Sequence, residues 1–180
     1  MILFLDIDGV LHPRDGHDHP LFGRTSLLWQ ILHACPAAEV VFSTSWRENF
    51  TVPEMMNFVT YGGGEELAHR FIGSTPVIDC GENDYRREDE CKSWLVANNL
   101  ENHPWLAIDD NASWFDAAHL HHVDYRFGLV ESDVAAIIDA IKQQTQACHL
   151  MRSRNNAERL VESIEQLATD DAERHTKRID

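Results

Sequence analysis

Two aspartates separated by one residue, Asp6 and Asp8, directly follow an apolar run at the start of the chain. A second acidic pair, Asp109 and Asp110, ends another apolar stretch, and the hydroxyl-rich segment 43–45 (Ser-Thr-Ser) ends a third. Buried carboxylates are costly unless they are paired, and carboxylates that converge raise one another's pKa values. A hard divalent cation with oxygen ligands removes this conflict, and Mg²⁺ is the usual cation in sites that also hold a substrate phosphate. These residue types therefore predict a magnesium site where the three stretches meet.

Strand and helix signals alternate along the chain. The fold that they predict determines whether these polar residues can meet. Short apolar runs indicate buried strands at 2–5, 38–46, 75–80, 104–110 and 121–125. Helical patterns and capping residues indicate helices at 25–35, 65–71, 86–100 and 131–144. Such alternation implies a parallel sheet with helices on both faces, and ligands bind these sheets at the carboxyl ends of the strands. We therefore expect both acidic pairs and the hydroxyl cluster at one edge of the sheet.

The composition is typical of a soluble protein with a single core. A chain of 180 residues is long enough for one full domain and too short for two comfortable ones. The formal net charge of −15 argues against binding nucleic acid through a broad basic surface. A local arginine patch stays open as an alternative, formed by Arg14, Arg24, Arg47, Arg86 and Arg87.

The cellular compartment is also predicted from composition. No apolar run approaches the roughly 20 residues that span a bilayer, and the first residues lack the basic region of a signal peptide. The four cysteines are widely spaced, without a CxxC pair, which favours free thiols in a reducing compartment. We predict a cytoplasmic protein that does not contact a membrane.

Several segments together resemble the haloacid dehalogenase (HAD) superfamily of phosphohydrolases. "DIDGV" at 6–10 resembles its motif I, "VVFSTSW" at 40–46 its motif II, and "WLAIDD" at 105–110 its motif IV. "YRFGLVESDVAAIIDAI" at 125–141 resembles the segment and final helix common in these proteins. More narrowly, "STSWR" and "CKSWL…PWLAIDD" resemble the HAD domain of Swiss Army Knife RNA-repair proteins.

The resemblance implies an overall organisation. It covers residues 1–145 and implies a three-layer, Rossmann-like α/β domain, essentially capless, because the segments after motifs I and II are too short for a large independent cap. Residues 146–180 are highly charged, with apolar residues at helical spacing, and predict an amphipathic C-terminal helix. We expect this extension to pack on the body, to self-associate or to bind a partner.

The resemblance also implies roles for the acidic residues. Asp6 would be the nucleophile that forms an aspartyl-phosphate, and Asp8 the general acid and base. Asp6, Asp8, Asp109 and Asp110 would hold Mg²⁺, Asp8 through its main-chain carbonyl. Asp110 would be a second ligand or would orient metal-bound water. Gly9 would let the backbone turn, so that Asp8 reaches over Asp6.

Motifs II and III leave alternatives open. Thr44 is our choice for the phosphate-binding hydroxyl of motif II, with Ser43 as the alternative. For the motif III cation, Lys92 is slightly favoured because it is a lysine, whereas Arg87 stands where the lysine usually lies. Arg47 is a further candidate for phosphate contact.

The function predicted is a Mg²⁺-dependent phosphatase acting on a phosphomonoester. An open site favours a nucleotide, a nucleic-acid end or a phosphoprotein over a small sugar phosphate. The alternative is a catalytically silent module that binds phosphate or a protein partner. His12, after motif I, is a candidate for substrate contact, and Trp46 is interpreted as core or rim packing.

Overall fold

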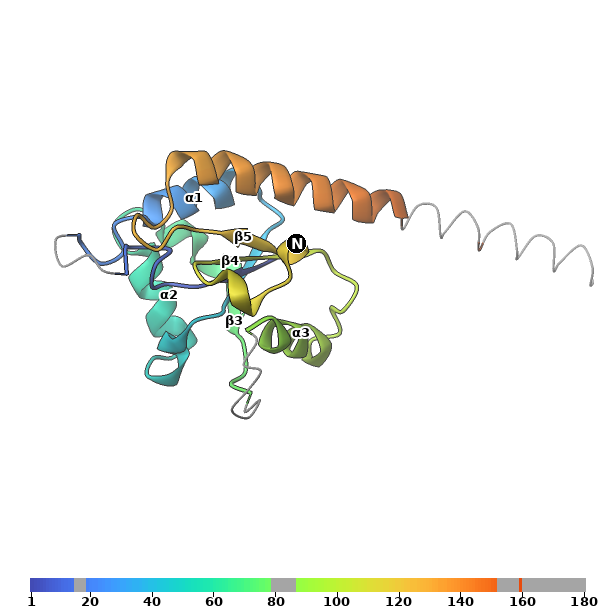
Figure 1. Ribbon diagram of the computed structural model, residues 1–180, viewed down its shortest axis with the longest axis horizontal. Helices are drawn as coiled ribbons and strands as arrows, with labels where there is room; N and C mark the ends of the chain where they lie inside the picture. Colours follow the sequence, from blue (N-terminus) through green and yellow to red (C-terminus); the bar gives the residue numbers. More distant parts are fainter. Residues whose placement is uncertain (15–18, 79–86, 152–158, 160–180) are drawn as a thin grey trace, which may run out of the picture. The chain divides into compact units, whose positions relative to one another are not determined.

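The structure of this chain is a computed structural model, which describes residues 1–14, 19–78, 87–151 and 159 (Figure 1). Its centre is a five-stranded sheet in the order β3-β2-β1-β4-β5, in which every neighbouring pair is parallel. The strands are β1 (Ile2–Leu5), β2 (Glu39–Phe42), β3 (Phe71–Ser74), β4 (Trp105–Asp109) and β5 (Leu120–His122). This confirms the predicted α/β architecture.

Helical segments lie between successive strands along the chain, as parallel pairing requires, and one more helix follows β5. The α-helices are α1 (Thr25–Ala34), α2 (Val52–Thr60) and α3 (Arg87–Ala97), and residues 131–144 are also helical. Short 3₁₀ helices are η1 (Ser45–Glu48), η2 (Glu65–Arg70), η3 (Ala112–Trp114) and η4 (Ala117–His119). The predicted helix at 65–71 is thus a 3₁₀ helix, and α1 is preceded by Arg24 without a side-chain cap.

Helices cover both faces of β1, and all four of its residues are therefore buried. Leu3 and Leu5 point to the face covered by α1 and the helix at 131–144. Ile2 and Phe4 point to the opposite face, where α3 packs. Figure 1 shows α1 and α3 on these opposite sides of the sheet, which makes three layers.

The segment between β2 and β3 is part of this body. Met55 and Val59 of α2 are fully buried in the same core cluster as Leu5. Trp29 of α1 donates a hydrogen bond from Nε1 to the Val59 carbonyl at 3.0 Å. Helix α2 therefore packs as core rather than as a separate lid, in keeping with an essentially capless domain.

The third strand lies earlier in the chain than the sequence predicts. We expected a strand at 75–80, but β3 is Phe71–Ser74, and residues 75–78 are not in a strand. Residues 79–80 lie outside the described part. Gly73 weakens the strand signal of residues 71–74 in the sequence, because glycine is unfavourable inside strands. Here it makes room for α3, since a Cβ at Gly73 would lie 3.2 Å from Nε1 of Trp94.

The chain divides into two compact units, Met1–Gln144 and Thr145–Asp180. Residues 145–151 of the second unit are helical. Most of the amphipathic helix predicted at 146–180 lies outside the described residues. Where the chain is described, no helix combines the length and apolar character needed to cross a bilayer.

Candidate active site

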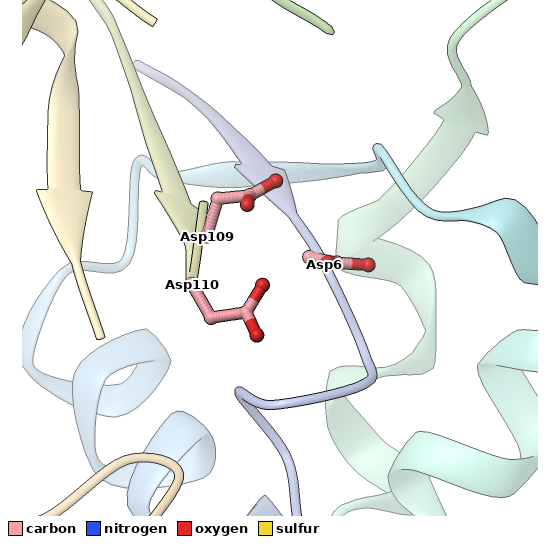
Figure 2. A group of neighbouring side chains, drawn as sticks. All are labelled: Asp6, Asp109 and Asp110. Carbon is pink, nitrogen blue, oxygen red and sulfur yellow. The ribbon is translucent and has the colours of Figure 1, made fainter. Parts of the chain in front are cut away.

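Three buried carboxylates meet at the carboxyl edge of the sheet (Figure 2). Asp6 follows β1, Asp109 ends β4 and Asp110 follows it. The register explains their meeting: Leu5 of β1 pairs with Ile108 of β4, and the Asp6 N–H donates to the Ile108 carbonyl at 3.1 Å. One ligand oxygen from each aspartate lies within 4.8 Å of the others. The structure thus brings together three of the four carboxylates that the sequence predicts to meet, and Asp8 is outside this group.

The three carboxylates lack enough donors to offset their charge. Asp109 accepts a hydrogen bond from Asn111 N–H on Oδ1, and Asp110 accepts one from Arg14 on Oδ1, each at 2.8 Å. Oδ2 of Asp109 and Oδ2 of Asp110 are buried and have no hydrogen-bond partner among the described residues. Buried polar atoms are normally satisfied, so these two oxygens point to a missing partner.

Burial makes the charged forms of these acids unfavourable. It raises the pKa of Asp109 to about 7, with the nearby charge of Asp6 adding to the effect and Arg87 opposing it. Burial also raises the pKa of Asp6, against the opposing charge of Arg87. The pKa of Asp110 is raised by burial and lowered by Arg14. A hard divalent cation bound through oxygens would offset this cost, so the residues present fit Mg²⁺.

The cation beside Asp6 is Arg87, the first residue of α3. Its Nη1 lies 3.2 Å from Oδ1 of Asp6 and 3.9 Å from Oδ2 of Asp109. Nη1 also donates to the Ser43 carbonyl, and the guanidinium lies over the Trp114 ring at 4.9 Å. The side chain is buried and held on several sides, so it presents a fixed positive charge at the site.

Lys92 does not lie at the site, contrary to our preference for it. Its side chain is 55% exposed, and its Nζ pairs with Oε1 of Glu88 at 2.7 Å. Five residues along an α-helix correspond to a rotation of about 140°, so Lys92 and Arg87 face different directions. The geometry thus favours Arg87 over Lys92 for the motif III position.

Asp8 lies beside the cluster, with its carboxylate held by other side chains. Its Oδ1 lies 3.1 Å from Nε2 of His12, and its Oδ2 accepts a hydrogen bond from Nε1 of Trp46 at 2.9 Å. These contacts lower the pKa of Asp8, His12 most strongly. The carboxylate of Asp8 is not in the group with Asp6, Asp109 and Asp110, so its metal role stays a prediction for its main-chain carbonyl.

Gly9 makes the turn that carries the chain past the acidic cluster. Its φ is +75°, which side-chain-bearing residues rarely adopt, and a Cβ there would lie 2.2 Å from Oδ2 of Asp110. Glycine is therefore required by conformation and by space, as the sequence predicts for the turn after Asp8.

The hydroxyls of motif II point in different directions. The Thr44 hydroxyl accepts a hydrogen bond from the Trp46 N–H at 3.4 Å, and its interaction with Asp6 opposes the rise in the pKa of Asp6. The Ser43 hydroxyl lies 3.6 Å from Sγ of Cys91, under α3. This places Thr44 toward the site, whereas Ser43 contributes its carbonyl to Arg87.

Arg47 lies in a buried ion pair. Its Nη2 is 2.6 Å from Oε2 of Glu90, and both side chains are almost fully buried. Its Nη1 donates to the Thr44 carbonyl at 2.6 Å. The structure therefore places Arg47 in the link between η1 and α3 rather than in an open phosphate pocket.

The sequence did not predict the contacts that three residues near the site make in the structure. The sequence predicts Arg14 only as part of a basic patch, whereas the structure pairs it with Asp110. His12 is considered for substrate contact and Trp46 for packing, yet both bind Asp8. The available signal was their position: His12 follows the motif I loop, and Trp46 lies two residues after Thr44.

The fold and these acids define the class of protein. A parallel sheet whose central strand is followed by Asp6, and whose neighbouring strand ends at Asp109 just before Asp110, is consistent with a HAD-superfamily domain. A model of the family described as "HAD domain in Swiss Army Knife RNA repair proteins" matches residues 2–134. The chain belongs to this family, and the resemblance seen in its motifs is confirmed. Membership indicates a phosphatase-type function.

Searches of curated proteins and of solved structures found no match to this chain.

Proposed function

We propose that this protein is a Mg²⁺-dependent phosphatase that hydrolyses a phosphomonoester through a phosphorylated Asp6. The observation that supports this most strongly is the buried group of Asp6, Asp109 and Asp110, in which two carboxylate oxygens have no hydrogen-bond partner in the described chain. Without a bound cation, burial and mutual repulsion make the charged forms of these acids unfavourable, and Arg87 and Arg14 offset this only in part. Asp6, Asp109, Asp110 and the main-chain carbonyl of Asp8 would hold the ion. When bound, it would supply positive charge to the phosphate oxygens and to Asp6.

The first step transfers the phosphoryl group to the protein. A carboxylate oxygen of Asp6 attacks phosphorus while the bond from phosphorus to the leaving oxygen breaks. Asp8 gives its proton to that leaving oxygen. Arg87 and the Thr44 hydroxyl, which both contact Asp6, would bind the phosphoryl oxygens and orient the nucleophile.

The second step returns Asp6 to its starting form. A water molecule attacks phosphorus, Asp8 accepts a proton from that water, and the bond between phosphorus and the Asp6 oxygen breaks. Inorganic phosphate leaves, and Asp8 is protonated for the next cycle. The same carboxyl group thus serves both steps.

The substrate that we propose is a nucleotide or the phosphorylated end of a nucleic acid. The family description refers to RNA-repair proteins, and α2 packs into the core instead of forming a lid. We expect the reaction in the cytoplasm. A panel containing mononucleotides and a 3′-phosphorylated oligonucleotide tests the substrate class.

Hydrolysis of 4-nitrophenyl phosphate tests the reaction itself. The wild type should turn over with MgCl₂ and stop with EDTA, and Asp6→Asn should lose at least about a thousandfold in kcat/KM. Calorimetric titration with MgCl₂ gives a readout that needs no turnover: Asp109→Asn should weaken binding about tenfold or more. A wild type that neither turns over nor binds Mg²⁺ would favour the silent module instead.

A further inference from the structure

Both carboxylate oxygens of Asp8 are hydrogen-bonded by side chains from different segments of the chain. Nε2 of His12 lies 3.1 Å from Oδ1, and Nε1 of Trp46 donates to Oδ2 at 2.9 Å. Asp8 itself is at the surface of the site, with its side chain 40% exposed, whereas the His12 side chain is 7% exposed. A partly exposed carboxylate ordinarily samples several rotamers, so two donors on one such group, one buried and one partly buried, are a restraint.

Each of the two donors is itself held in place. The Phe22 N–H donates to Nδ1 of His12 at 3.5 Å, which leaves the proton on Nε2 directed at Asp8. The Trp46 ring packs against the rings of Phe22 and Phe50, each with centroids 5.3 Å away, and against Phe58 at 6.1 Å. The indole N–H therefore has a fixed direction, set by aromatic packing from α2 and the loop before α1.

The hydrogen bonds from His12 and Trp46 leave part of the Asp8 carboxylate free to contact a substrate. A carboxylate has about four acceptor positions, and His12 and Trp46 occupy two of them. A cavity of about 250 Å³ opens on this side of the site, lined by Asp8, Trp46 and Phe50 among others. A substrate in that cavity has access to the remaining positions of Asp8.

We propose that His12 and Trp46 are positioning residues that hold Asp8 in the orientation needed to protonate the leaving oxygen. This inference rests on the proposed phosphatase function and adds two residues to it. Neither residue touches the phosphoryl group. Both act through Asp8, because proton transfer requires the donor within hydrogen-bond reach of the reacting oxygen.

The dependence on the leaving group separates this role from general damage to the fold. Phenyl phosphate releases a weakly acidic phenol and needs its proton, whereas 4-nitrophenyl phosphate releases a more acidic phenol and depends on it less. The quantity to measure is the leaving-group ratio, defined as kcat/KM for 4-nitrophenyl phosphate divided by kcat/KM for phenyl phosphate. A lost proton donor raises this ratio, but a protein that is merely less folded loses activity equally with both substrates.

Trp46→Phe keeps most of the ring packing and removes the N–H. We expect it to raise the leaving-group ratio about tenfold, part of the roughly 10²- to 10⁴-fold that general acid catalysis supplies. Trp105→Phe is the matched control, because it makes the same substitution at the start of β4, away from Asp109, where the ring stacks on His119. It should leave the ratio unchanged.

His12 provides an independent pair of variants. His12→Leu removes the donor and should also raise the ratio about tenfold, whereas His12→Gln retains an N–H at a similar reach and should restore most of it. In an Asp8→Asn background, Trp46→Phe should change the ratio no further, because the group it positions is gone.

Three results would overturn the positioning role. An unchanged ratio in both Trp46→Phe and His12→Leu, with equal losses for the two substrates, would assign these residues to packing alone. A rise in the ratio that persists in the Asp8→Asn background would show that Trp46 does not act through Asp8. A wild type that hydrolyses neither aryl phosphate with MgCl₂ would remove the proposed function and this role with it, and that outcome is distinct from the other two.

Discussion

The guanidinium of Arg87 contacts Asp6 and faces Asp109 at longer range. An arginine here provides a planar fork of donors with a permanent charge, which suits the several oxygens of a phosphoryl group. Its contacts with the Ser43 carbonyl and the Trp114 ring fix that fork before substrate arrives. Preorganised charge of this kind favours the transition state over the ground state.

Removing the Arg87 guanidinium should therefore reduce turnover, and it should also destabilise the fold, because Asp6 would stay buried without its partner. We expect Arg87→Met to lower kcat/KM for 4-nitrophenyl phosphate about a hundredfold or more. Arg87→Lys, which keeps the charge and loses the fork, should fall between this variant and the wild type. Lys92→Met is the control, since the Lys92 side chain pairs with Glu88, and it should stay within about twofold of the wild type. The reverse order of the Arg87 and Lys92 variants would show that Lys92 fills the motif III position.

Gly9 offers a second test at a single position. Gly9→Ala should destabilise the fold by at least about 1 kcal/mol, because its φ is +75°. It should also weaken Mg²⁺ binding in calorimetry, because the new Cβ would displace Oδ2 of Asp110. Gly62→Ala is matched in φ, at +88°, and its Cβ would meet nothing within 4 Å. Gly62→Ala should lower the unfolding free energy and leave Mg²⁺ binding unchanged. Equal Mg²⁺ binding in the Gly9→Ala and Gly62→Ala variants would contradict the proposed site.

Between elements, the site depends on how α3 is anchored to the end of β2. Arg47 of η1 and Glu90 of α3 form an ion pair whose side chains are 4% and 0% exposed. Arg47 also donates to the Thr44 carbonyl, so this pair connects the motif II segment to the helix that carries Arg87. Breaking one partner leaves a buried charge, which is the costly outcome for such pairs.

Glu90→Gln should lower the unfolding free energy by about 3 kcal/mol or more, measured by urea denaturation. The double variant Arg47→Met, Glu90→Leu should recover much of that loss, because it removes both charges together and keeps apolar volume. Equal destabilisation of the single and double variants would mean that the pair contributes through packing and not through charge.

The strands that end at the acidic cluster were predictable from sequence. The basic residue that lies beside Asp6 was not. The apolar runs before Asp6 and Asp109 are long enough to indicate buried strands, and parallel topology then brings their ends together. The competition between Arg87 and Lys92 depends on where α3 begins and which way it faces. Element boundaries are the least certain part of any sequence-based prediction, and a small shift in the start of α3 changes which residue faces Asp6.

Other contacts of the site lie beyond sequence patterns for a related reason. The bonds from His12 and Trp46 to Asp8 join residues whose separations, four and 38 along the chain, follow no helix or strand period. Strand β3 was misplaced because Gly73 weakens its strand signal. Its role in packing under Trp94 becomes visible only in three dimensions.

The three buried aspartates at one edge of the sheet affect the stability of the whole fold, because their charged forms are unfavourable there. The pKa of Asp109 is raised to about 7, above its ordinary value of 3.8, and the pKa values of Asp6 and Asp110 are raised too. A folded-state pKa above the unfolded value means that the folded protein binds protons more tightly. Stability from these acids is therefore present at low pH and is lost as the pH rises from about 4 to about 7.

The metal-free protein should accordingly lose on the order of a few kcal/mol of unfolding free energy between about pH 5 and about pH 8 in EDTA. Urea denaturation at a series of pH values measures this, and Asp109→Asn should reduce the slope because the amide does not titrate. Excess MgCl₂ should restore stability mainly at the higher pH, where the acids are charged. A wild type and an Asp109→Asn variant with the same pH dependence would contradict the raised pKa.

The proposed phosphoryl transfer to Asp6 is tested by finding which residue carries the phosphoryl group. Wild type and Asp8→Asn are mixed with excess 4-nitrophenyl phosphate and MgCl₂, quenched in acid and analysed by peptide mass spectrometry. The proposed mechanism predicts one phosphoryl group on Asp6, accumulating most in Asp8→Asn because that variant lacks the base for the second step, and absent when EDTA replaces MgCl₂. A phosphoryl group on another residue, or full turnover by Asp6→Asn, would contradict it.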